Sequence, residues 1–168
     1  MIAIRDERPE DYADVYRVNA AAFGQEGEAA LVERLRGACE YVSLVAVEDG
    51  TVVGHIFFSP VTVESEHGGF EATGLGPMAV APEFQNRGVG SQLVRRGLEE
   101  CARRGHEVVF VLGHPEFYPR FGFTPAKAQG LTCEYTVPDD VFMVLELKPG
   151  VLRGRTGLVK YRPEFAEV

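Results

Sequence analysis

The sequence predicts an α/β fold with a mixed sheet, and two stretches of the chain carry this prediction. From Tyr41 to Val80, apolar and β-branched runs separated by glycine turns are typical of an antiparallel meander. From Leu75 to Leu112, a strand, an amphipathic helix and a second apolar strand follow one another. That order indicates a right-handed crossover between parallel strands. Both kinds of pairing in one chain predict a mixed sheet whose N-terminal half is antiparallel.

The N-terminal part predicts one strand followed by two helices. Ile2 to Arg5 is a short apolar run, and Pro9 suits the first turn of a helix, where its missing N–H costs nothing. Apolar residues then recur at spacings of three and four from Tyr12 to Phe23, which predicts a helix with one inward face. Gly24 to Gly27 interrupt this pattern, and Glu28 to Leu35 predict a second short helix.

The meander is delimited by turn residues. Asp49-Gly50 predicts a two-residue hairpin, because a type I′ turn needs positive φ at both central positions. The returning strand starts at Thr51, and Pro60 is expected either to limit it or to mark a bulge. Gly68-Gly69 predicts the next turn. The strand from Phe70 to Val80 contains glycines and a proline, so we expect it to be distorted.

The C-terminal third predicts short extended segments. Phe123 to Pro125 is expected to be extended, and Leu131 to Val137 and Val141 to Leu147 are expected to form two strands. Gly157 to Tyr161 predicts one more strand. We expect the tail from Val151 to Val168 to pack at the edge of the domain.

Size and charge narrow the class of protein. A chain of 168 residues is the size of one domain, and we expect residues 1–168 to form a single domain. The formal net charge of −8 argues against a protein that holds nucleic acid through its phosphates. The N-terminus lacks an apolar signal core, and no run is long enough to cross a membrane. We therefore expect a cytoplasmic protein that binds neither nucleic acid nor membrane.

The residues that commonly hold metals are scattered. The three cysteines, Cys39, Cys101 and Cys133, form no CxxC pair, which fits a reducing compartment. The four histidines, His55, His67, His106 and His114, show no ligand spacing. The sequence therefore predicts no metal site.

The strongest sign of chemistry is the turn Gln85-Asn86-Arg87-Gly88-Val89-Gly90, between the strand that ends at Val80 and the helix that follows. The first N–H groups of a helix have no partner within it, and its dipole is positive at that end. Gly88 and Gly90 allow a ligand to approach the backbone closely. The turn lacks the signatures of a dinucleotide site and of a nucleotide triphosphate loop. It predicts a different kind of phosphate site.

These residues resemble the signature of the GNAT superfamily of acyl-CoA-dependent N-acetyltransferases, Q/R-x-x-G-x-G/A. Gln85, Gly88 and Gly90 fit it without a gap, and Met78 to Pro82 fit the strand that precedes it in the family. Tyr118 to Phe123 match the second signature, Y-x-x-x-G-F. The resemblance covers nearly the whole chain. It implies a strongly twisted sheet of about seven strands with helices on both faces.

The resemblance also implies a co-substrate, acetyl-CoA, and no metal. Backbone groups of the strand would pair with the pantetheine arm, the turn would hold the pyrophosphate, and Arg87 would contact a CoA phosphate. The implied acetyl-CoA-binding residues are Met78, Ala79, Val80, Gln85, Asn86, Arg87, Gly88, Val89, Gly90 and Ser91.

The implied reaction is acetyl transfer to a primary amine, with Tyr118 as the general acid that protonates the CoA thiolate. The acceptor is an amine-bearing small molecule or peptide, and a homodimer is left open. No acid lies between Leu75 and Ala81, where many relatives carry a glutamate. The general base is thus open among Glu26, Glu28, Glu71, His114 and Glu116, and the alternatives are proton loss through water molecules or an acceptor that needs no dedicated base. The alternative function is a catalytically silent acyl-CoA-binding sensor or scaffold of the same fold.

Overall fold

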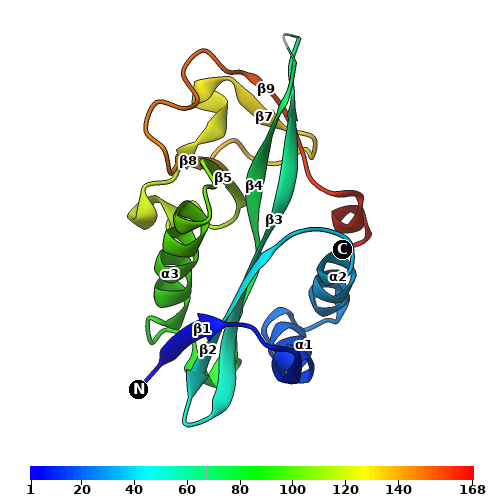
Figure 1. Cartoon of the computed structure of the whole chain (residues 1–168), viewed down its shortest axis with the longest axis vertical. Coiled ribbons are helices and arrows are strands. Elements are labelled where there is room, and N and C mark those ends of the chain that lie inside the picture. The colour runs from blue at the N-terminus through cyan, green and yellow to red at the C-terminus, as the bar shows by residue number, and fades with distance from the viewer. Residues whose placement is uncertain (67) are drawn as a thin grey trace. The chain divides into compact units, whose positions relative to one another are not determined.

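The computed structural model describes residues 1–66 and 68–168 (Figure 1). His67, one of the histidines considered for a metal site and the residue before the Gly68-Gly69 turn, lies outside the described residues. The chain forms two compact units, each made of separate stretches of sequence. Unit 1 consists of Met1–Ser59, Gly76–Glu100 and Pro163–Val168, and unit 2 consists of Pro60–Leu75 and Cys101–Arg162.

The regular structure of the described chain consists of α-helices, strands and short 3-10 turns. The α-helices of the described chain are α1 (Tyr12–Phe23), α2 (Gly27–Arg36) and α3 (Val89–Arg103). The strands are β1 (Ala3–Asp6), β2 (Val42–Glu48), β3 (Thr51–Glu64), β4 (Phe70–Val80), β5 (Val108–Leu112), β6 (Thr124–Pro125), β7 (Leu131–Cys133), β8 (Phe142–Glu146) and β9 (Gly157–Lys160). Among the described helices, none combines the length and apolar character needed to span a bilayer.

The strands pair in the order β1-β2-β3-β4-β5-β8-β6, with β9 pairing to both β3 and β7. The β1–β2 and β2–β3 pairs are antiparallel, whereas β4 and β5 are parallel. This confirms the predicted mixed sheet with an antiparallel N-terminal half. The described sheet has nine strands rather than the about seven that the resemblance implied, and two of them, β6 and β7, are only two and three residues long.

In unit 1, helices cover both faces of the sheet, as the resemblance implied. Figure 1 shows α3 on one side of β2 and β3, and α1 and α2 on the other. Successive residues of β3 point to opposite faces. Phe57 packs in the core cluster with Val15 of α1 and Leu31 of α2, whereas Phe58 faces Gly97 of α3.

The turns of unit 1 follow the local sequence closely. Asp49 and Gly50 have φ values of 50° and 76°, which confirms the predicted hairpin between β2 and β3. Gly24 ends α1 in the left-handed conformation, with φ 71°. These turns are decided by a few adjacent residues, so the sequence predicted them well.

Two predictions for unit 2 are wrong. The strand predicted over Leu131–Val137 ends at Cys133, because Tyr135 N–H turns back to donate to Cys133 Sγ at 3.4 Å. The tail does not merely pack at an edge. Its strand, β9, lies between β3 and β7, antiparallel to the first and parallel to the second. The role of Pro60, which the sequence left open, is also clear. Strand β3 continues through Pro60 to Glu64, so this proline does not limit the strand.

Candidate functional site

The connection from β4 to α3 is a tight turn with a defined backbone. Asn86 and Gly88 adopt positive φ values of 64° and 80°, on either side of Arg87. The side chain of Gln85 donates from Nε2 to the carbonyl oxygen of Val80 at 3.0 Å. This bond ties the turn to the end of the strand, so Gln85 acts here through its side chain on the protein's own backbone.

The turn presents the N-terminus of α3. Gln92 N–H is the first to bond within this helix, to Gly88 O at 3.1 Å, so the amides of Val89, Gly90 and Ser91 precede the intrahelical ladder. Gly90 and Ser91 are half-buried, and Asn86 to Gly88 are exposed. The dipole of a helix of 15 residues is positive at this end. The arrangement can hold a phosphate group through backbone N–H groups.

The position of this helix end is fixed by close packing on β3. Val89 is 1% exposed and anchors the first turn of α3. A Cβ at Gly54 would lie 3.0 Å from Leu93 Cδ1 and 3.1 Å from Val89 Cγ1. A Cβ at Gly97 would lie 2.5 Å from Cε1 of the Phe58 ring, closer than real Cβ atoms approach. Helix α3 can therefore pack this closely on β3 only because Gly54 and Gly97 have no side chain.

The strand before the turn alternates between core and surface. Ala79 is 2% exposed and belongs to the core cluster of α1 and α2. Met78 and Val80, its neighbours, are half-buried. The parallel ladder of β4 with β5 pairs Thr73, Gly74 and Leu75, and β4 continues beyond it to Val80. Backbone groups of Met78 to Val80 thus lie past the described end of that ladder.

Tyr118 lies in unit 2, in a 3-10 turn that spans Tyr118–Phe121. Its ring is 6% exposed and meets Phe117 and Phe123 edge-on, with centroids 5.0 and 5.7 Å away. It also packs against Gly113, where a Cβ would collide with the ring. Burial raises the pKa of the Tyr118 phenol to about 12, so the phenol is protonated at neutral pH. A protonated phenol is the form that a general acid requires.

The candidate general bases are spread over both units. In unit 1, Glu26 and Glu28 lie where α1 joins α2, and their carboxylates accept hydrogen bonds from Tyr16 Oη at 2.7 Å and Gln25 Nε2 at 3.0 Å. In unit 2, Glu71, His114 and Glu116 are exposed. The geometry favours none of these five as the base.

A buried polar network of unit 1 joins Asn19, on the inward face of α1, to His55 and Ser43, and its two histidine contacts were not predicted. Asn19 Nδ2 donates to Val15 O at 3.0 Å and lies 3.1 Å from Nδ1 of His55, whose Nε2 lies 2.9 Å from Ser43 Oγ. Asn19 and His55 are both 0% exposed, and Asn19 Oδ1 has no hydrogen-bond partner among the described atoms. Burial, aided by the charge of Arg36, lowers the pKa of His55 to about 3, so its ring is neutral. The alternation of β3 placed His55 on the α1 side, which is the signal that could have revealed it.

Among the residues that the structure describes, no group of three or more His, Cys, Asp or Glu side chains is arranged to hold a metal ion.

Comparison with known proteins finds a matching family model and similar proteins. Residues 3–126 match the family model described as an acetyltransferase (GNAT) domain. The chain is 36% identical over 164 residues to YhbS of Escherichia coli (strain K12), an uncharacterized N-acetyltransferase, covering 96% of this chain and 97% of YhbS.

Two solved structures resemble the whole chain. The crystal structure of E. coli YhbS in complex with CoA superimposes with a TM-score of 0.92 at 35% identity, covering 98% of this chain and 92% of that one. A GNAT family acetyltransferase from Brucella melitensis in complex with acetyl-CoA gives a TM-score of 0.81 at 34% identity, covering 98% of both chains.

Proposed function

Because this chain belongs to the GNAT family of N-acetyltransferases, we propose that it transfers an acetyl group from acetyl-CoA to a primary amine by direct attack on the thioester. The observation that carries the proposal is the turn from β4 into α3, with two residues at positive φ and a helix end seated by Gly54 and Gly97. The similar proteins from E. coli and B. melitensis were crystallised with CoA and acetyl-CoA, which supports the same co-substrate here.

The pyrophosphate of acetyl-CoA would lie at the N-terminus of α3. The donors are the backbone N–H groups from Asn86 to Ser91, which need no particular side chain. Arg87 is exposed and would contact a CoA phosphate with its guanidinium, which lies 5.3 Å from the centre of the Phe84 ring.

The pantetheine arm would lie along β4 at Met78, Ala79 and Val80. These residues follow the described end of the β4–β5 ladder, so their backbone groups suit an added strand. One of their N–H groups would also polarise the thioester carbonyl, as an oxyanion donor does. The strand thus both positions the donor and stabilises charge on its oxygen.

The reaction balances without a further co-reactant. The acceptor nitrogen forms a bond to the acyl carbon, and the negative charge gathers on the carbonyl oxygen. The C–S bond then breaks, the electron pair leaves on sulfur, and Tyr118 gives its phenolic proton to the thiolate. The proton lost by the amine goes to solvent or to one of the five candidate bases. Alignment of two already reactive groups supplies much of the rate.

The second candidate function is an acyl-CoA-binding sensor or scaffold without turnover. The sequence feature that favours it is the lack of any acid from Leu75 to Ala81. Substitution Tyr118→Phe separates the two functions, because it removes the proton and keeps the ring. An enzyme loses turnover and keeps acetyl-CoA binding, whereas a sensor shows no turnover in either form.

The direct test is release of free CoA thiol from acetyl-CoA in the presence of polyamines, amino acids, aminoglycosides and peptides. We expect at least one class of amine to accelerate release, with mass spectrometry detecting the acetylated product. Thermal-shift measurements with acetyl-CoA, ATP and NAD provide the binding control. Stabilisation by either nucleotide but not by acetyl-CoA would contradict the proposal.

We propose further that residues 1–168 act as one acetyltransferase domain. The support is chain continuity, since β3, β4 and α3 each contribute residues to both compact units. Denaturant unfolding followed by two probes should then give coincident transitions. Two separated transitions would show that the units unfold independently.

A further inference from the structure

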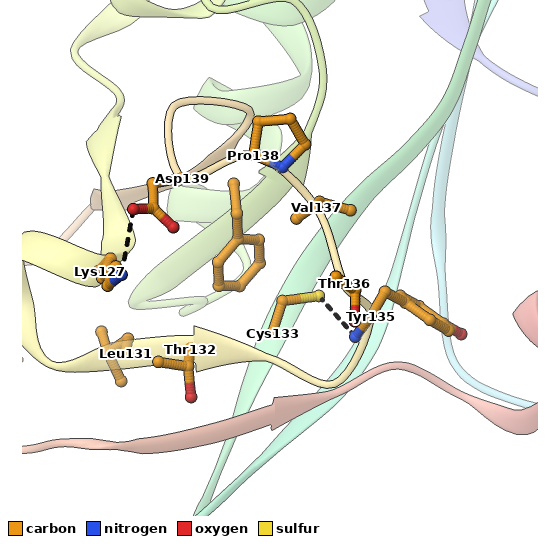
Figure 2. A pocket seen from close by; sticks show the side chains of 10 residues that line it. Lys127, Leu131, Thr132, Cys133, Tyr135, Thr136, Val137, Pro138 and Asp139 are labelled. Atoms are coloured by element: carbon orange, nitrogen blue, oxygen red, sulfur yellow. Dashed lines mark hydrogen bonds and ion pairs between the residues drawn. The ribbon is translucent and has the colours of Figure 1, made fainter.

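Unit 2 contains a cavity that the proposed reaction does not use. It lies between β7, the start of β8 and the segment Tyr135–Asp139 that connects them (Figure 2). Its volume is about 160 Å³. A cavity of ~150 Å³ in another protein holds a benzene ring, so this one can take an apolar group of similar size.

The floor of the cavity is apolar. Leu131 is 0% exposed and Phe142 is 4% exposed, and both line it. Val137 and the half-buried thiol of Cys133 continue the lining. Burial raises the pKa of Cys133, so its thiol remains uncharged at neutral pH. The inner part of the cavity therefore suits a hydrocarbon side chain.

One end of the cavity carries a cation and an anion side by side. Figure 2 shows Lys127 and Asp139 joined there, with Nζ and Oδ2 3.1 Å apart. Their side chains are 64% and 66% exposed. An ion pair so exposed contributes little to stability. Lys127 and Asp139 can therefore each give up this partner for an oppositely charged group of a ligand at a small cost in free energy.

Several described contacts hold the segment Tyr135–Asp139, among them the ring of Tyr135, whose centroid lies 6.0 Å from that of Tyr161. The described contacts that hold it to the opposite wall include the Lys127–Asp139 pair and the N–H of Tyr135 donating to Cys133 Sγ at 3.4 Å. Sulfur is a weak acceptor. Thr132 and Thr136 are also among the residues that line the cavity.

We propose that this cavity binds a free α-amino acid with an apolar side chain. The carboxylate of the ligand would pair with Lys127, its ammonium would pair with Asp139, and its side chain would lie beside Val137 and Phe142. An anion alone would face Asp139, and a cation alone would face Lys127. A zwitterion satisfies both charges at once. This inference concerns binding and does not rest on the proposed acetyl transfer.

The first test is calorimetric titration of the full chain with L-leucine and with three analogues that each lack one feature. Leucinamide lacks the carboxylate, 4-methylpentanoate lacks the ammonium, and glycine lacks the side chain. We expect L-leucine to bind, and each analogue to bind about ten-fold more weakly or not at all. Absence of L-leucine, L-methionine and L-phenylalanine binding in the millimolar range would overturn the proposal, as would equal binding of L-leucine and glycine.

The second test uses a matched pair of substitutions in unit 2. Lys127→Ala removes the proposed carboxylate partner. Lys148→Ala removes an equally exposed lysine, whose Nζ lies 3.4 Å from Glu107 Oε2. We expect Lys127→Ala to weaken L-leucine binding about ten-fold and Lys148→Ala to leave it unchanged. Equal affinity in the two variants would overturn the assignment of the carboxylate to Lys127.

The thiol of Cys133 provides a local reading of occupancy. Alkylation by iodoacetamide, followed peptide by peptide with mass spectrometry, should slow at Cys133 when L-leucine is added. Cys39, a half-buried thiol of unit 1, should react at an unchanged rate. Equal protection of both cysteines, or of neither, would show that L-leucine does not occupy this cavity.

Discussion

The two signature turns of this protein solve different physical problems. The glycine turn, Gln85–Gly90, is exposed from Asn86 to Gly88 and presents its backbone. The tyrosine turn, Tyr118–Phe123, buries its ring to 6% exposure and offers one phenol. Each has a residue in the left-handed region, at Gly88 with φ 80° and at Gly122 with φ 99°.

This contrast teaches which kind of change each turn tolerates. A backbone site depends on φ values and on the seat of its helix, so side chains within it can vary. A phenol site depends on one atom, whereas its aromatic surroundings only fix that atom in place. Substitutions in each turn separate the two cases.

Tyr118→Phe should have the largest effect. We expect kcat to fall about a hundred- to ten-thousand-fold, because loss of a general acid costs that much, while the KM for acetyl-CoA stays unchanged. Phe117→Leu is the control, since it alters the ring that meets Tyr118 at 5.0 Å and keeps the phenol. Equal losses in both variants would mean that Tyr118 acts through packing.

Because the pKa of Tyr118 is raised to about 12, its titration should cause no loss of activity between pH 8 and 10, roughly two units or more below that pKa.

His55 should make the free energy of unfolding depend on pH. Its folded pKa, about 3, lies below the unfolded value of about 6.5. Between these two pKa values, the unfolded chain binds a proton at His55 that the folded chain does not. The contribution of His55 to the free energy of unfolding is therefore complete above the unfolded pKa and falls as the pH decreases below it. The slope from this residue is about 1.4 kcal/mol per pH unit.

Urea unfolding at several pH values measures this slope. His55→Gln should reduce it, whereas His114→Gln, which changes an exposed histidine, should leave it as in the original protein. An unchanged slope in His55→Gln would assign the acid sensitivity to other groups. One such group is Asp11, whose pKa is lowered by its hydrogen bonds with Arg5.

Gly88→Ala should weaken acetyl-CoA binding while leaving the fold intact. Beyond the adjacent residues, no atom lies within 4 Å of an added Cβ, so the cost is backbone strain of about 1–2 kcal/mol. Gly105→Ala is matched, with φ 90° and the same open space, but lies after the end of α3. Both should lose similar stability in urea. Only Gly88→Ala should raise the Kd for acetyl-CoA, and a rise in both would mean that the strain spreads beyond the turn.

Gln85→Met should have the smallest effect. It keeps a side chain of similar length without adding a charge, and it removes the N–H that donates to Val80 O, a bond worth about 0.5–1.5 kcal/mol. Gln129→Met is the matched control, because Gln129 Nε2 donates to Thr124 Oγ1 at 3.1 Å across the same sequence separation. We expect a weaker affinity for acetyl-CoA in the first variant and an unchanged one in the second. Calorimetry measures both.

Much of the fold was predictable wherever neighbouring residues decide the conformation. The hairpin at Asp49-Gly50, the end of α1 at Gly24 and the inward stripe of α3 all follow from turn chemistry or from periodicity. The strand Phe70–Val80 was predicted with its observed bounds. The role of Tyr118 and the acetyl-CoA contacts remain predictions that the experiments above address.

The sequence by itself determined the local conformations: the glycine turn, the helix that follows it and the order of strands and helices. Tertiary structure alone decided that β9 joins the sheet beside β3, that Gly54 and Gly97 seat α3, and that a cavity forms beside Cys133. The physical reason is range. A turn is set by the φ preferences of two or three adjacent residues, whereas strand pairing and cavity shape depend on residues far apart in the chain. Periodicity within one segment carries no record of those distant partners.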